Sequence, residues 1–217
     1  MTIIEMHSGI DELMDKPGSP YFNSTQKDFY LNLAQLEFTK ERYAEFEFNE
    51  KRRQDILPLV RKMSFTTLTI NLDNTTIPLF MYVLAMSVTA KDECDTEFTY
   101  PAKPMRWDDY WESELDPFNK AAIDNPVYLT SNNGTNDIIE IKGITTLVLV
   151  NMTYLKRPVQ VLNDENTPAN NVNCELPVST HEEIVNLAVR KMLEVSKDPN
   201  YQLHLNEIAN QESNRKT

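Results

Sequence analysis

The sequence predicts an α+β fold, in which a helical subdomain of N-terminal helices and a C-terminal helix carries an inserted antiparallel β subdomain. Residues 1–63 and the segment from residue 178 place apolar residues at helical spacing, whereas residues 64–177 alternate apolar and polar residues as strands do. Helices and strands do not alternate along the chain, so a doubly wound nucleotide-binding sheet is not expected. We therefore divide the chain into residues 1–63, 64–177 and 178–217, the last comprising a helix and tail that return to the helical subdomain.

Residues 1–63 are expected to form three helices. The first lies near residues 2–14, and the second begins at Ser24 or Thr25. The third is expected within NEKRRQDILPLVRKM, capped by Asp55, with Pro58 in its first turn where a missing amide costs little. The apolar residues at helical spacing along the second helix are Phe29, Leu33, Leu36 and Tyr43.

Residues 64–177 are expected to form strands. TLTINL alternates apolar and polar residues, which predicts a half-buried strand, and the apolar run at 79–90 predicts a fully buried one. NDIIEIKGITTLVLVNMTYL predicts two strands joined by a tight hairpin at Lys142-Gly143. Between them, MRWDDYWESELDPF has aromatic and acidic residues at helical spacing and predicts a short helix that ends at Pro117.

The start of the C-terminal helix is predicted at Thr180. The Thr180 hydroxyl can accept from the backbone amide of Glu183, while the Glu183 carboxylate reaches back to the amide of Thr180, which is a capping box. We expect Thr180 to matter for stability and its neighbour His181 to matter little. The apolar face that follows this cap consists of Ile184, Leu187, Ala188, Met192 and Val195.

The same stretch also has the first half of a zinc-protease motif. His181 and Glu182 match its opening, but a second histidine is needed four residues after the first, and that position is Val185. The later His204 is more than six helical turns further on, beyond the reach of a local site. A helix start is therefore favoured over a catalytic metal site.

Composition limits the classes of partner. The chain has 33 acidic against 21 basic residues, a net charge of −12, which opposes tight binding to DNA or RNA. Cys94 and Cys174 have no CxxC spacing and are expected to be reduced and inert. The sequence shows neither an apolar run long enough for a membrane span nor a secretory signal, so we expect synthesis in the cytoplasm.

Catalytic patterns are weak, and we expect no enzyme, cofactor or metal site. Asp108, Asp109 and Glu112 leave open a metal-dependent hydrolase, although an exposed acidic helix is favoured in a chain this acidic. No serine or cysteine stands in a recognisable nucleophile setting. Trp107 and Trp111 on the same stretch are more typical of core or interface anchors than of a ligand cage.

Four segments in order carry a resemblance that covers roughly residues 24 to 203. They are YLNLAQLEFTKERYAEFEFNEKRRQDILPLV, WESELDPFNKAAIDNPVYLTSNNGTNDIIEI, VNMTYLKRPVQV and STHEEIVNLAVRKMLEVSKDPNYQ. Together they resemble the ring or tail-adaptor proteins, the head-to-tail connectors, of short-tailed crAss-like bacteriophages. The resemblance implies a non-enzymatic virion protein at the portal vertex, with a helical and a β subdomain.

The resemblance also implies partners. It predicts a ring of roughly a dozen copies that contacts the portal protein and further tail proteins, with genomic DNA passing through the bore unbound. In such a ring, aromatic residues at the surface are candidates for the contacts between subunits, namely Phe46, Phe48, Trp107, Trp111 and Tyr201. The polar tail from about residue 206 is expected to become ordered against a neighbouring subunit.

The alternative function is that of an acidic monomeric regulator or chaperone-like protein that binds a basic partner.

Overall fold

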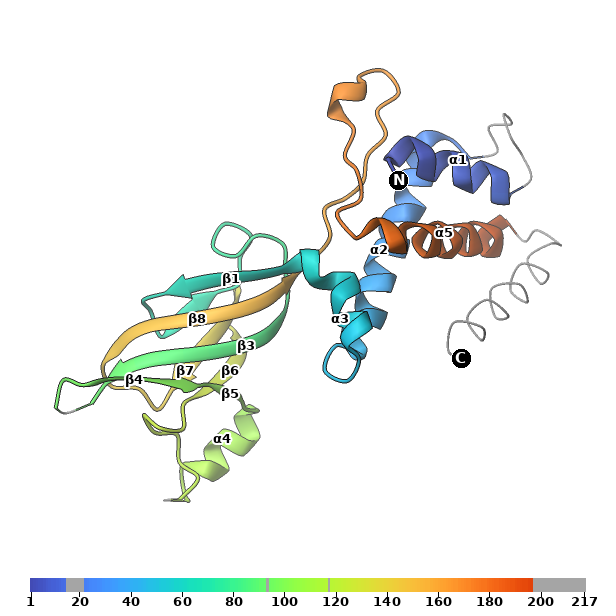
Figure 1. Ribbon diagram of the computed structural model, residues 1–217. Coiled ribbons are helices and arrows are strands. Elements are labelled where there is room, and N and C mark those ends of the chain that lie inside the picture. Colours follow the sequence, from blue (N-terminus) through green and yellow to red (C-terminus); the bar gives the residue numbers. More distant parts are fainter. Residues whose placement is uncertain (15–21, 93, 117, 197–217) are drawn as a thin grey trace. The chain divides into compact units, whose positions relative to one another are not determined.

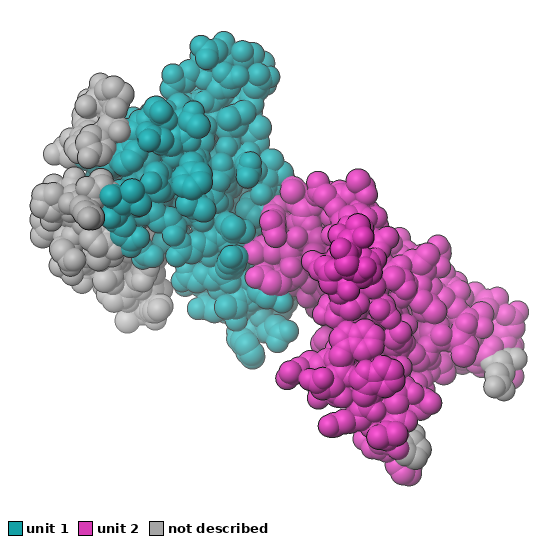
Figure 2. Space-filling view, turned by 180° about the vertical axis from the view of Figure 1, so that it is seen from behind, with its two compact units in different colours: residues 1–59, 158–217 teal, residues 60–157 magenta. Residues whose placement is uncertain are grey.

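The computed structural model describes residues 1–14, 22–92, 94–116 and 118–196, and it has the α+β fold predicted above (Figure 1). The chain forms two compact units, a helical unit of residues 1–59 and 158–217 and a β unit of residues 60–157. Figure 2 shows them in teal and magenta. The β unit is thus inserted into the helical unit, as the change of periodicity along the chain indicates.

The boundaries of the insertion differ from the predicted 63/64 and 177/178. Val60 already pairs with Leu155 in a sheet, because the strand starts directly after the last helical turn. At the other end, residues 158–177 belong to the helical unit, although they have no helical periodicity. Their backbone is held by side chains of the N-terminal helices, for example by a hydrogen bond of 3.0 Å from Asn32 Nδ2 to the Val161 carbonyl.

Among its described residues, the helical unit has the helices α1, α2, α3 and α5 and the short 3-10 turns η1, η2 and η3. Their bounds are α1 Ile3–Leu13, α2 Ser24–Ala44, α3 Glu50–Ile56, η1 Leu57–Leu59, η2 Pro168–Asn170, η3 Val178–Thr180 and α5 His181–Ser196. None of the helices described up to Ser196 is long and apolar enough to cross a membrane.

The first helices begin at side-chain caps. Thr2 forms a capping box with Glu5 at the start of α1, and Asn23 forms one with Gln26 at the start of α2. The cap predicted for the third helix was wrong. Asn49 Oδ1 accepts from the amides at the start of α3, whereas Asp55 lies in its last turn and accepts from Arg42 Nε at 3.1 Å.

The buried face of α2 is not the one marked by its apolar spacing. Phe29 and Leu33 are 58% and 39% exposed. The buried side includes four polar residues, because α2 packs on α5 and contacts the 158–177 segment through hydrogen bonds. The buried residues of α2 are Asp28, Leu31, Ala34, Gln35, Phe38, Thr39 and Arg42.

The predicted face of α5 is largely confirmed. Ile184, Leu187, Ala188 and Met192 are buried. Val195, near the end of the helix, is 66% exposed, so the apolar face extends beyond the buried part.

The described residues of the β unit form two four-stranded sheets and the short helix α4. The first sheet is antiparallel and has the order β1-β8-β3-β4, with bounds Val60–Phe65, Leu147–Lys156, Phe80–Lys91 and Glu97–Pro101. The second has the order β2-β7-β6-β5, with bounds Thr69–Asn71, Asp137–Lys142, Val127–Asn132 and Lys103–Pro104. Its β5–β6 pair is parallel, which departs from the antiparallel prediction.

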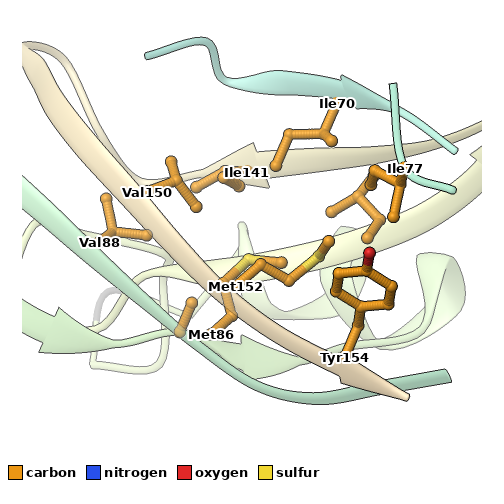
Figure 3. Close-up of a cluster of buried hydrophobic side chains, with 10 residues drawn as sticks. Ile70, Ile77, Met86, Val88, Ile141, Val150, Met152 and Tyr154 are labelled. Atoms are coloured by element: carbon orange, nitrogen blue, oxygen red, sulfur yellow. The ribbon is translucent and has the colours of Figure 1, made fainter. Parts of the chain in front are cut away.

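The core of the β unit draws side chains from both sheets (Figure 3). Ile70 is buried within the predicted TLTINL strand, as expected. The run at 79–90 is β3, but only alternate residues in its second half, Met86, Val88 and Ala90, are fully buried. A strand that packs with one face on another sheet buries every second residue, so the prediction of a fully buried strand was wrong.

Lys142-Gly143 does not form the predicted hairpin. β7 and β8 lie in different sheets, and the chain crosses from one to the other between residues 142 and 147. Gly143 has φ of +89°, and a Cβ there would lie 2.7 Å from the Ala122 backbone nitrogen. The glycine is therefore required by a left-handed backbone and a close approach rather than by a two-residue turn.

Candidate interaction surfaces

α4 (Trp107–Ser113) is the short helix predicted between residues 105 and 118. Asp108 and Asp109 stand in its first turn, where carboxylates interact favourably with the helix dipole. Ser113 is buried at its end and donates to the Tyr110 carbonyl at 2.8 Å.

Trp107 anchors α4 to the second sheet. Its Nε1 donates to the Thr130 carbonyl on β6 at 3.1 Å, and Lys142 Nζ lies 5.8 Å from its ring centroid. A cation at this distance from an indole face is attracted by the ring. Trp107 thus makes its contacts within the β unit. The centroid of the Trp111 ring lies 6.5 Å from that of the Trp107 ring.

The outer side of α4 and the loop after it expose large apolar side chains. Trp111, Leu115 and Phe118 are 64%, 86% and 94% exposed, and we call them the α4 surface. Asp108, Asp109 and Glu112 are exposed beside it. Sequence reasoning singled out Trp111 but missed Leu115 and Phe118, whose only signal was their apolar character within an acidic run.

The Asp116 carboxylate bonds two residues of the loop after α4. Asp116 accepts from the Phe118 amide at 2.9 Å and from Asn119 Nδ2 at 2.6 Å. These bonds lower the pKa of Asp116, with the Phe118 amide as the largest cause. Burial raises the pKa of Tyr110, and a hydrogen bond to Glu114 adds to the rise. The backbone of Phe118 and the side chain of Asn119 are therefore both bonded to Asp116.

The acids of α4 do not assemble a metal centre. Across the described residues, no three His, Cys, Asp or Glu side chains are grouped so that they could hold a metal ion. Asp108 has a side chain 87% exposed and lies 3.8 Å from Arg106. Within the part of the chain that the structure describes, the geometry therefore adds no support to the hydrolase hypothesis.

The turn between α2 and α3 carries the other two described candidates. The Arg53 guanidinium lies 5.1 Å from the Phe46 ring centroid, so Phe46 has a partner within the helical unit. Phe48 is 89% exposed and projects from the turn. Tyr201 and the tail from residue 206 lie outside the described residues.

The start of α5 is built around buried polar groups. α5 begins at His181, directly after Thr180, as expected. Thr180 Oγ1 donates to the Pro177 carbonyl at 2.8 Å, and the Glu183 carboxylate pairs with the buried Arg42. The capping box between Thr180 and Glu183 stays a prediction. The pairing with Arg42 was missed because nothing local in the sequence connects residues so far apart.

His181 is part of the core. It is 2% exposed, and its Nε2 donates to the Leu176 carbonyl at 2.8 Å. The expectation that His181 matters little therefore needs correction, because a buried imidazole fills volume and satisfies a carbonyl.

The two cysteines are free and differ in exposure. Cys94 is exposed, whereas burial raises the pKa of the Cys174 thiol to about 11. A thiol with so high a pKa has little thiolate at neutral pH, which agrees with the inert behaviour expected for Cys174. Exposure gives Cys94 no such protection.

Comparisons with protein-family models and with curated proteins find no match for this chain.

Proposed function

We propose that this protein is a structural subunit of a ring that joins the portal of a short-tailed crAss-like bacteriophage to its tail and surrounds the path of the DNA. The α4 surface carries the proposal. Trp111 on α4 and Leu115 and Phe118 after it are 64–94% exposed, and large apolar side chains exposed so close together in the chain favour a protein interface. That the assembly is a ring between portal and tail is inferred from the resemblance to phage tail-adaptor proteins.

The negative net charge of the chain suits a ring through which DNA passes without binding. DNA affinity comes mainly from lysine and arginine, which are outnumbered here by acids to give −12 per subunit. A ring of roughly a dozen such chains repels DNA phosphates, so the genome passes without sticking. The proposed role requires no enzymatic activity.

A second candidate is an acidic monomer that regulates or protects a basic protein. The exposed Asp108, Asp109 and Glu112 beside the α4 surface favour it, because they suit a partner rimmed by lysine and arginine. The two functions differ in assembly. The monomer binds its partner in a small complex of fixed ratio, whereas the ring subunit forms a large cyclic oligomer at the portal.

Analytical ultracentrifugation with the phage portal protein separates them. We expect mainly monomer at low salt, and rings with portal or at about 1 M salt, where the screening length falls to about 3 Å. Stable rings at low salt without portal contradict templating by the portal. A chain that stays monomeric under every condition, with portal present, sinks the ring proposal.

Trp111→Ser tests the surface itself. We expect the variant to fold as the wild type does, because Trp111 is 64% exposed, but to weaken assembly at least about tenfold, as the loss of an interface tryptophan does. Phe29→Ser is the matched control on the helical unit, since that side chain is 58% exposed, is also aromatic and is not an interface candidate. Assembly at wild-type affinity by Trp111→Ser removes the α4 surface from the interface.

A further inference from the structure

A polar row on α2 holds the segment of residues 158–176, which we call the strap. Ser24, Asp28 and Asn32 are spaced four residues apart and so lie along one side of the helix. Asn32 exchanges two hydrogen bonds with Val161, of 3.0 and 2.7 Å. Asp28 Oδ2 accepts from the Asn163 amide at 3.0 Å, and Ser24 Oγ donates to the Asn163 carbonyl at 3.1 Å.

His7 of α1 joins this row to the strap. It is 6% exposed, with Nε2 at 2.8 Å from Asp28 Oδ1 and Nδ1 at 3.2 Å from Asn163 Nδ2. Both ring nitrogens are therefore engaged, one by a carboxylate of α2 and one by a side-chain amide of the strap. We call Asp28, His7 and Asn163 the latch.

The hydrogen-bond network fixes the tautomer of His7. The Asp164 backbone amide can only donate, so the Asn171 atom it meets at 2.8 Å is Oδ1. Asn171 then donates through Nδ2 to Asn163 Oδ1 at 3.2 Å, which turns Asn163 Nδ2 toward the imidazole. His7 Nδ1 must therefore accept, and its proton resides on Nε2, facing Asp28.

We propose that the latch holds the strap on α1 and α2 most firmly while His7 is neutral, and that protonation of Nδ1 loosens the strap by removing the bond from Asn163. A proton on Nδ1 turns this acceptor into a donor that faces the donor amide of Asn163. The bond between Nε2 and Asp28 survives protonation, so the loss is confined to the strap side. The proposal is independent of the function proposed above.

The charges around His7 set the direction of the response. Burial lowers the pKa of His7 below 6.5 and outweighs Asp28, which raises it, while Lys27 lowers it and Asp11 raises it. The Asp164 carboxylate accepts from residues of the strap itself, and α5 presents the apolar Val185 near Gly9 of α1. Because the folded pKa is depressed, the neutral latch is fully stable above pH 6.5 and loses stability as the pH falls below it.

Hydrogen–deuterium exchange across pH tests the loosening of the strap. After correction for intrinsic rates, protection of the Val161 and Asn163 amides is expected to fall about three- to tenfold between about pH 7.5 and about pH 5, the change that corresponds to one hydrogen bond. Amides in the middle of α2 keep their protection. Equal loss in α2 and the strap means general unfolding and overturns the proposal, as does a strap whose protection ignores pH.

Two variants separate the latch from other titrating groups. His7→Gln keeps one donor and one acceptor at every pH, so the pH dependence of strap protection is expected to disappear. His181→Gln alters the second histidine that is buried among the described residues; it bonds Leu176 outside the latch, and the variant is expected to retain that dependence. The opposite pattern overturns the assignment.

Nitrogen-15 NMR of the wild-type imidazoles gives a reading that needs no variant. At neutral pH, His7 is expected to carry its proton on Nε2 and to show an unprotonated Nδ1. A proton on Nδ1 at neutral pH overturns the proposal even if His7→Gln does not fold.

Discussion

The helical unit and the β unit are stabilised by different chemistry. The helical unit buries seven polar or charged side chains among its described residues, including Asp28, Arg42 and the two histidines. The β unit has a core of aliphatic residues with two methionines and one tyrosine, and its described buried polar residues are Ser113 and Lys156. Polar interiors depend on complete pairing, whereas apolar interiors depend on volume. The helical unit should therefore be the more sensitive to charge and pH.

The largest expected effect comes from removing the centre of the polar interior. Arg42 is 1% exposed, its guanidinium lies 4.4 Å from the Phe38 ring centroid, and it pairs with Asp55 and Glu183. Arg42→Ala removes the buried cation that pairs with both carboxylates, and we expect a loss of about 4 kcal/mol in the free energy of unfolding, measured in urea. The control Arg52→Ala removes an exposed pair with Glu45 and should cost at most about 1 kcal/mol. If Arg42→Ala and Arg52→Ala lost equal stability, burial of the Arg42 ion pairs would not explain their contribution.

The matching disruption of the β unit is Met152→Ala. Met152 is 1% exposed between the sheets, so truncation leaves a cavity and should cost about 3 kcal/mol. Because its packing involves no titrating contact, the loss should be the same at about pH 7.5 and about pH 5.5. Urea unfolding at both values checks this. If the loss of stability in Met152→Ala depended strongly on pH, the proposed difference in pH sensitivity between the two units would be wrong.

His181→Ala probes the polar interior at a single hydrogen bond. The change removes the donor to the Leu176 carbonyl and empties a site that is 2% exposed, so we expect a loss of about 2 kcal/mol. Thermal unfolding followed by circular dichroism measures it. A silent His181→Ala would restore the original expectation from the sequence.

The smallest effect is expected at the helix start. Thr180→Ala removes a hydroxyl that donates to the Pro177 carbonyl and is predicted to cap α5, with a cost of about 1 kcal/mol. Thr180→Ser retains the hydroxyl and serves as the control in the same thermal measurement. If both variants lose equal stability, the packing of the threonine methyl decides rather than the cap.

At the candidate site, the sequence predicts the helix but not which of its side chains are exposed. The short helix with Trp107 and Trp111 is visible in the spacing of aromatic and acidic residues. That Trp107 is tied to Thr130 while Leu115 and Phe118 are exposed is not visible, since exposure depends on which sheet the helix meets. Apolar residues alone do not distinguish core from interface.

The sequence by itself determined the α+β class, the insertion of strands between helices and most helix starts, because periodicity and capping are local properties of a few neighbouring residues. Only the tertiary structure decided which side of α2 is buried, that the strap belongs to the helical unit, and that Gly143 serves a crossing between sheets. These features join residues far apart in the chain, such as Asp28 with Asn163 and Arg42 with Glu183. A buried polar group needs a partner from whichever element packs against it, and local sequence patterns do not name that partner.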